Sequence, residues 1–87
     1  MDDPNRLRHI FGEPRHNLGR LVRLYGGESA AAKAIEAAVQ AAFRNGELII
    51  NDNGLYRRAF DIGGLSVTVS GRIVDGVARV GTAWISP

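Results

Sequence analysis

Apolar residues recur at helical spacing through the first half of the chain. Asp3 and Asn17 are typical N-terminal helix caps, and Gly12 and Gly26 are typical helix ends. A third, alanine-rich segment has the highest helix propensity of the chain. The pattern therefore predicts helices over residues 4–11, 17–25 and 29–45.

The second half of the chain changes to a period of two and to β-branched residues. This pattern predicts strands over residues 48–50, 55–62, 65–74 and 77–85. Gly63-Gly64 and Asp75-Gly76 are two-residue hairpin signals, which join the last three strands into a meander. The fold class is therefore α+β, with two or three N-terminal helices packed on a three- or four-stranded antiparallel sheet.

Two-residue turns fix the register, and the register separates two faces of the sheet. The apolar face, which the helices are expected to cover, carries Tyr56, Phe60, Ile62, Leu65, Val67, Val69, Ile73, Val80 and Trp84. The polar face carries Arg57, Asp61, Ser66, Thr68, Ser70, Arg72 and Arg79. Because Trp84 shares a row with Phe60 and Val67, the pattern favours a core position for this residue.

Three arginines converge on the predicted polar face. Arg72 is expected directly opposite Arg79, with Arg57 one row away. Like charges placed opposite each other destabilise a sheet. Either the three side chains splay into solvent toward Asp61 or Asp75, or they form an anion site that accepts a phosphate.

Two polar residues interrupt the apolar face, because Arg58 and Thr82 flank Val69 in one row. One explanation is that they lie at the edge of the helix layer, where a cleft opens. Another is that Gly81 forms a β-bulge, which would turn Thr82 to the opposite face. In a third, the Thr82 hydroxyl only bonds to the backbone.

The composition describes one small globular domain over residues 1–87. It has 45% hydrophobic and 23% charged residues and no cysteine, which excludes disulfides, thiolate metal sites and thiol nucleophiles. No apolar run is long enough to span a membrane, and no signal-peptide pattern is present. Lys33 is the only lysine among eleven basic residues. This excess of arginine reflects either a GC-rich genome or a need to hold phosphate or carboxylate groups.

The remaining side chains suit metal-free cleavage of RNA. The two histidines, His9 and His16, are too few for a structural zinc site, and P-loop and dinucleotide fingerprints are absent. RNA supplies its own nucleophile, the 2′-hydroxyl, so the protein needs only proton-transfer groups and cations near the phosphorus. Histidine and arginine meet these needs, and an aromatic ring can stack on a base. Each histidine is either such a group or an inert surface residue.

Several segments follow one another in a distinctive order. They are RLRHIF (6–11), HNL (16–18), LV (21–22), YG (25–26), VDGV (74–77) and RVGTAWI (79–85). In this order they resemble the C-terminal toxin domains of bacterial polymorphic and contact-dependent growth inhibition toxins. These domains are similar to the barnase and colicin type of ribonuclease fold, in which N-terminal helices pack on an antiparallel sheet. The resemblance covers nearly the whole chain.

The resemblance implies a metal-independent endoribonuclease toxin without a cofactor, often directed at tRNA. Such a domain is secreted or delivered as the end of a larger protein and acts in the cytoplasm of the target cell. A cognate immunity protein neutralises it, and the basic charge of this chain predicts an acidic one. The two rival interpretations are a non-catalytic RNA- or protein-binding module and a small adaptor or immunity-type protein that uses its sheet face.

The resemblance also suggests site residues. It maps the family's catalytic histidine onto His16 first and His9 second, its basic residue onto Arg79, and its C-terminal hydroxyl and aromatic residues onto Thr82 and Trp84. The expected catalytic set is His16, His9, Arg79 and Thr82, and the expected RNA-binding set is Arg72, Arg57, Arg58 and Trp84. The predicted register puts Arg79 on the polar face but Thr82 and Trp84 on the other. The set can therefore share one site only across a bulge or an edge cleft.

Overall fold

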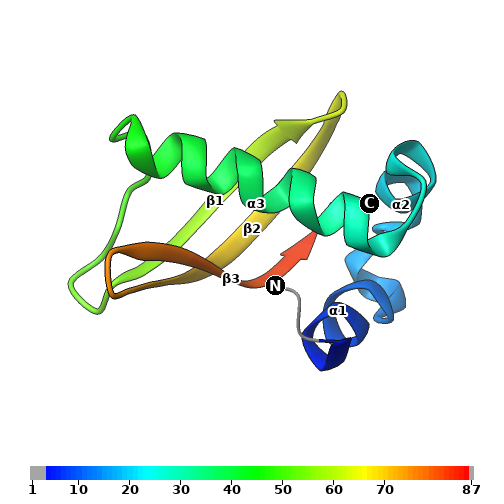
Figure 1. Ribbon diagram of the computed structural model, residues 1–87, viewed down its shortest axis with the longest axis horizontal. Coiled ribbons are helices and arrows are strands. Elements are labelled where there is room, and N and C mark those ends of the chain that lie inside the picture. The colour runs from blue at the N-terminus through cyan, green and yellow to red at the C-terminus, as the bar shows by residue number, and fades with distance from the viewer. Residues whose placement is uncertain (1–3, 87) are drawn as a thin grey trace.

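The computed structural model, which describes residues 4–86, is an α+β fold with helices on a three-stranded antiparallel meander. The element order is α1 (Pro4–Phe11), the 3₁₀ helix η1 (Pro14–His16), α2 (Gly19–Tyr25), α3 (Glu28–Arg44), β1 (Leu55–Ile62), β2 (Leu65–Val74) and β3 (Val77–Trp84). Figure 1 shows α3 lying across one face of the sheet, with α1 and α2 gathered at one end. The predicted fold class is confirmed.

The helices lie close to their predicted positions. The first has the predicted bounds and ends at Gly12, whose N–H donates to the carbonyl of Arg8 at 2.8 Å; the predicted cap, Asp3, lies outside the described residues. The second begins at Gly19 and not at Asn17, because Asn17 has a left-handed φ of 57° and closes η1 instead. Within the described residues, no helix is both long and apolar enough to cross a membrane.

The three long strands of the meander match the predicted ones to within a residue at each end. Both turns carry positive φ angles, 61° and 80° at Gly63-Gly64 and 53° and 77° at Asp75-Gly76, as expected of two-residue hairpins. The prediction of a short strand over residues 48–50 is wrong, because Ile50 makes only an isolated bridge to Tyr56.

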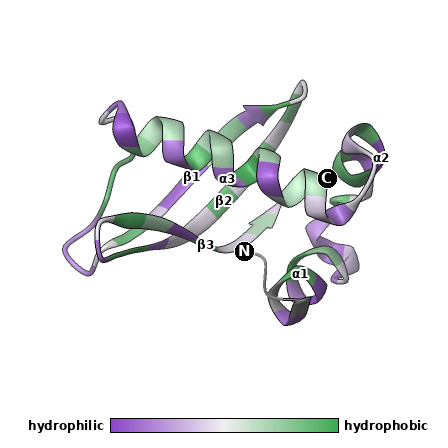
Figure 2. Cartoon of the chain, in the orientation of Figure 1, coloured by the Kyte–Doolittle hydropathy of each residue, from purple (hydrophilic) through white to green (hydrophobic). Residues whose placement is uncertain are grey.

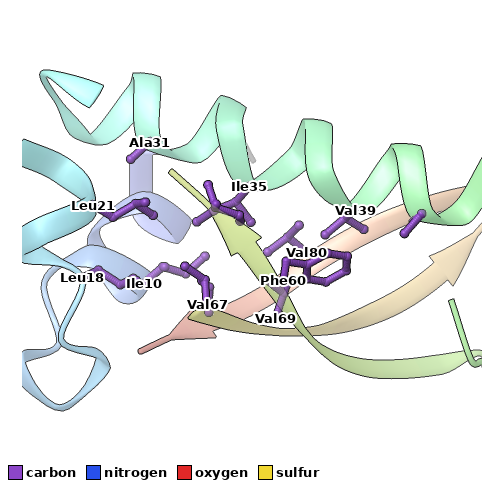
Figure 3. Packing of buried hydrophobic residues seen from close by; sticks show 14 of the residues in the cluster. Ile10, Leu18, Leu21, Ala31, Ile35, Val39, Phe60, Val67, Val69 and Val80 are labelled. Carbon is purple, nitrogen blue, oxygen red and sulfur yellow. The ribbon is translucent and has the colours of Figure 1, made fainter. Parts of the chain in front are cut away.

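The core lies between α3 and the inner face of the sheet. Figure 3 shows Ile35 and Val39 of α3 facing Val67, Val69 and Phe60 of the sheet. Hydrophobic and hydrophilic residues alternate along α3 in Figure 2, as expected of a helix with one face on the sheet. The N-terminal segments close the end of this core with Ile10, Leu18 and Leu21. The core lies on the face of the sheet that α3 covers, and α3 leaves the opposite face uncovered.

Candidate active site

The face of the sheet opposite α3 carries a groove with a volume of about 930 Å³, within the size range of ligand sites. Strand residues form most of it, and α1 and the segment before β1 add to its walls. Its lining includes most of the residues singled out from the sequence, namely His9, Arg57, Arg72, Arg79, Thr82 and Trp84. Among the described residues, no Asp or Glu lines it.

The arginines occupy the positions that the register predicted. Arg72 is the cross-strand partner of Arg79, and Arg57 is the partner of Ser70 one row away. In the part of the chain that the structure describes, none of these three guanidinium groups has a carboxylate within 4.0 Å. The Asp61 carboxylate instead accepts a hydrogen bond from the Gly64 N–H at 3.0 Å. Among the described residues, no acidic side chain therefore neutralises the positive charge of the groove.

A β-bulge brings the C-terminal part of β3 into this groove. The predicted register holds from Val77 to Val80 and then shifts, so that Ser70 pairs with Thr82 and Gly81 is the extra residue. Of the alternatives for Thr82, the bulge is confirmed. Arg79, Thr82 and Trp84 thereby line one groove, and Ala83, which is fully buried, takes the inner position opposite Val69.

The prediction that Trp84 belongs to the core is wrong. The register shift turns Trp84 to the outer face, where it pairs with Thr68 and lines the groove. The Arg57 guanidinium lies 4.9 Å from the centroid of its ring, a cation–π distance. Trp84 therefore presents an aromatic surface next to the arginines.

The Thr82 hydroxyl is a polar atom without a satisfied hydrogen bond. Its Oγ1 is buried and has no hydrogen-bond partner among the described residues, so the alternative in which this hydroxyl only bonds to the backbone is wrong. Buried hydroxyls are seldom left in this state. Thr82 lines the groove beside the arginines, but its Oγ1 has almost no accessible surface. A ligand oxygen can reach this hydroxyl only when the wall of the groove moves.

His9 and His16 lie next to each other but differ in access to the groove. Their ring centroids are 6.1 Å apart with the ring planes at 85°. His9 is exposed and lines the groove, whereas His16 is half-buried and is not among the lining residues. His16 Nδ1 lies 2.6 Å from the Ile10 carbonyl oxygen, which can only accept, so Nδ1 carries the proton. In the neutral ring, Nε2 is then free to accept one.

The position of His16 is fixed by the short helix that contains it. The Glu13 side chain caps η1 by accepting from the Arg15 N–H at 3.2 Å, and the Arg15 side chain lowers the pKa of this carboxyl. The His16 carbonyl accepts from the Ile85 N–H at 2.8 Å, directly after β3. α1, η1 and the end of β3 are therefore joined at the histidine pair, and Figure 1 shows them side by side.

Arg58 lies outside the groove. It is exposed on the edge strand β1, and its guanidinium lies 4.8 Å from the ring centroid of Phe60, which is a core residue. Arg58 therefore lies on the helix side of the sheet. The sequence analysis offered this position, at the edge of the helix layer, as one alternative. The groove does not include it.

The lining also includes residues that the sequence analysis did not assign to the site, and Tyr56 and Gly71 are the two that make a specific contact. The Tyr56 hydroxyl donates a hydrogen bond to the Arg79 carbonyl at 2.7 Å, next to the bulge. Burial raises the pKa of Tyr56 to about 12. Gly71, directly opposite Tyr56, leaves room for this contact. In the sequence, a glycine among the β-branched residues of β2 is the signal that another group comes close to the backbone there.

Within the described residues, no group of three or more His, Cys, Asp or Glu side chains is placed to hold a metal ion. Comparison with protein-family models, curated proteins and solved structures finds no match to this chain. The function is therefore argued from the groove itself.

Proposed function

We propose that this domain is a metal-independent endoribonuclease and that the groove is its active site. The observation that supports this most strongly is the composition of the groove. It combines three arginines, a histidine, an unsatisfied hydroxyl and an aromatic ring, without a carboxylate among its described lining residues. A polyanion with planar bases and its own nucleophile matches this set.

Arg72 and Arg79 bind the phosphate at the cleavage position. Each guanidinium can hold two phosphate oxygens, and a phosphate between the two side chains removes the repulsion that their direct opposition creates. Thr82 Oγ1, which is buried and has no partner among the described residues, donates a further hydrogen bond to a phosphate oxygen once the wall of the groove moves to expose it. The same cations stabilise the additional negative charge of the pentacoordinate transition state.

Arg57 and Trp84 bind the base or ribose next to that phosphate. A ring surface that faces a groove can stack on any base, and base stacking on an aromatic residue is worth about 1–3 kcal/mol. The Arg57 guanidinium lies over this ring, so a base that stacks on the same ring face takes the place of the guanidinium. This arrangement favours single-stranded RNA, whose bases are free to leave their own stacks.

His9 transfers the proton, because it is the histidine that lines the groove. It removes the proton from the ribose 2′-hydroxyl; the 2′-oxygen then bonds to phosphorus, and the bond from phosphorus to the 5′-oxygen breaks. The 5′-oxygen takes up a proton from Nε2 of protonated His16, which leaves a 2′,3′-cyclic phosphate, a free 5′-hydroxyl, a protonated His9 and a neutral His16. His16 is the second proton-transfer group. Its Nδ1 is bonded to the Ile10 carbonyl oxygen, so only Nε2 can exchange a proton.

A cleavage assay tests this proposal. The purified domain is incubated with total RNA in EDTA, and the products are separated and their 3′ ends analysed. We expect cleavage that leaves cyclic phosphates and that falls at least about 100-fold in His9→Gln, the usual size of a general acid–base contribution. The control is Arg44→Gln, at the exposed end of α3 and outside the groove. No cleavage of any RNA, with or without metal ions, would refute the enzyme proposal.

One observation favours a second candidate, a non-catalytic RNA-binding module. His9 is the only histidine among the described lining residues of the groove, so a second proton-transfer group has to act from outside it. A pure binding module uses the arginines for electrostatic attraction only. It predicts RNA binding that weakens steeply with salt and yields no product.

The biological role proposed from the sequence resemblance is that of an antibacterial toxin domain, delivered as part of a larger protein and neutralised by an acidic immunity protein. The uncompensated cationic groove supports the expectation of an acidic inhibitor. Expression in bacteria tests this role. Toxicity that is lost in His9→Gln supports it, whereas harmless expression of a cleavage-competent domain contradicts it.

A further inference from the structure

Tyr56 reaches across the sheet from β1 to β3. Its side chain is only 4% exposed and belongs to the core on the inner face. Its direct partner on the central strand is Gly71, and its hydroxyl passes that residue to donate to the Arg79 carbonyl on β3 at 2.7 Å. The phenol thus connects the two outer strands of the meander.

Gly71 is required for this contact. A Cβ at Gly71 would overlap the Arg79 carbonyl oxygen and would lie 2.6 Å from the Tyr56 hydroxyl oxygen. The φ angle of Gly71 is not in the left-handed region, so the requirement is one of space and not of backbone conformation. Only the absence of a side chain allows the hydroxyl and the β3 backbone to meet over β2.

The contact lies where the register changes. Gly71 still pairs with Val80 in the register that the turn sets, and the shift begins with the next pair, Ser70 and Thr82. Without the bulge, the period-two pattern would continue and would turn Thr82 and Trp84 to the inner face. That unbulged register also gives a consistent apolar row, with Trp84 beside Val67 and Phe60. The chain therefore has two plausible registers, and a specific contact is needed to select one.

We propose that Tyr56 is a positioning residue of the groove, whose hydrogen bond to the Arg79 carbonyl, made over Gly71, holds the β3 bulge that turns Thr82 and Trp84 outward. Gln40 assists it, since its Nε2 donates to the neighbouring carbonyl, that of Ala78, at 2.6 Å. Two successive carbonyls of β3 are thus held by side chains from other elements. The consequence for RNA binding rests on the proposed function, but the structural role does not.

The test compares Tyr56→Phe with Tyr25→Phe. Phenylalanine keeps the buried ring and removes only the hydroxyl, so the core is retained. Tyr25 is exposed at the end of α2 and is the matched control. NMR cross-strand contacts report the register: a Ser70–Thr82 contact marks the bulge, and a Ser70–Gly81 contact marks its loss. The fluorescence of Trp84, the single tryptophan, reports whether its ring faces solvent or the core.

A third measurement is the affinity for a short oligodeoxyuridine, which lacks the 2′-hydroxyl and is not cleaved by the proposed route. In Tyr56→Phe we expect the Ser70–Thr82 contact to weaken or disappear, the Trp84 emission to shift to shorter wavelength, and the affinity to fall at least about tenfold through loss of base stacking. Tyr25→Phe should match the unmodified domain in all three.

Two results would overturn the positioning role. One is a folded Tyr56→Phe domain with an unchanged register and unchanged Trp84 emission. The other is global unfolding of Tyr56→Phe, because the hydroxyl would then support the whole fold and not the bulge. If the unmodified domain neither binds nor cleaves nucleic acid, the proposed function fails, while the register and fluorescence data still decide the role of Tyr56.

Discussion

Arg72 and Arg79 lie directly opposite each other on neighbouring strands, and among the described residues no carboxylate lies within 4.0 Å of either. A cross-strand pair of like charges destabilises a sheet. The pair lies on the face that α3 leaves uncovered and lines the same groove as Thr82 and Trp84. An anion bound between the two guanidinium groups would remove this repulsion.

Removal of one of the two charges should therefore stabilise the free domain. We expect Arg79→Gln to raise the free energy of unfolding by about 0.2–1 kcal/mol at low salt, with a smaller gain at high salt. Urea denaturation at two salt concentrations measures this. Arg44→Gln should show no gain, because Arg44 lies at a helix C-terminus, where a positive charge is favourable. Destabilisation by Arg79→Gln in low salt would contradict the repulsion.

Trp84 should contribute little to the stability of the domain, because the bulge places it outside the core. We expect Trp84→Ala to cost no more than about 1 kcal/mol, whereas Phe60→Ala, in the core at 7% exposure, should cost about 3–5 kcal/mol. Chemical denaturation of both variants gives the comparison. Equal losses would indicate a buried Trp84 and the unbulged register.

The two glycines beside the bulge should respond differently to an added methyl group. Gly71→Ala should cost about 3 kcal/mol, since the new Cβ overlaps the backbone of Arg79. Gly81→Ala should cost less, about 1 kcal/mol, because its Cβ would lie 3.3 Å from the Ser70 carbonyl oxygen, a tight contact that a shift of a few tenths of an ångström relieves. Thermal unfolding of the two variants measures the difference. A tolerated Gly71→Ala would contradict the close contact of β2 and β3.

Tyr56 should give the domain a distinct loss of stability at alkaline pH. Burial raises its pKa from 10.0 to about 12, so the unfolded chain ionises first as the pH rises. This contribution to the free energy of unfolding is fully present below pH 10 and is lost between about pH 10 and pH 12, an effect on the order of 1–3 kcal/mol. The free energy of unfolding measured across this range should fall less in Tyr56→Phe. Parallel curves for the two proteins would contradict the prediction.

The sequence predicts the sheet well as far as its local signals extend. Gly63-Gly64 and Asp75-Gly76 fix both hairpins, and the opposition of Arg72 and Arg79 follows from them. The signal ends at Gly81, where the pattern is consistent with either register. The choice depends on Tyr56, which is distant in sequence and reaches β3 over a third strand. Local periodicity cannot encode such a contact. For this reason the sequence pattern favours a core position for Trp84, which the structure shows to be wrong.

The histidines show a similar limit. Helical spacing places His9 on the outward side of its helix, but the direction of that side depends on how α1 packs against β3 and α3. The resemblance ranked His16 first, whereas His9 is the one that lines the groove. The bond from His16 to the Ile10 carbonyl joins a 3₁₀ helix to the preceding α-helix. Only the tertiary arrangement determines this bond.

The most direct test of the groove as the functional site is the RNA cleavage rate of Arg79→Gln relative to Arg44→Gln, measured in EDTA on the same RNA. Both variants lose one arginine charge, but only Arg79 lines the groove. We predict that Arg79→Gln loses at least about 100-fold, as expected when a group that stabilises transition-state charge is removed, and that Arg44→Gln retains the rate of the unmodified domain. Equal rates in the two variants, or no cleavage by the unmodified domain, would contradict the assignment.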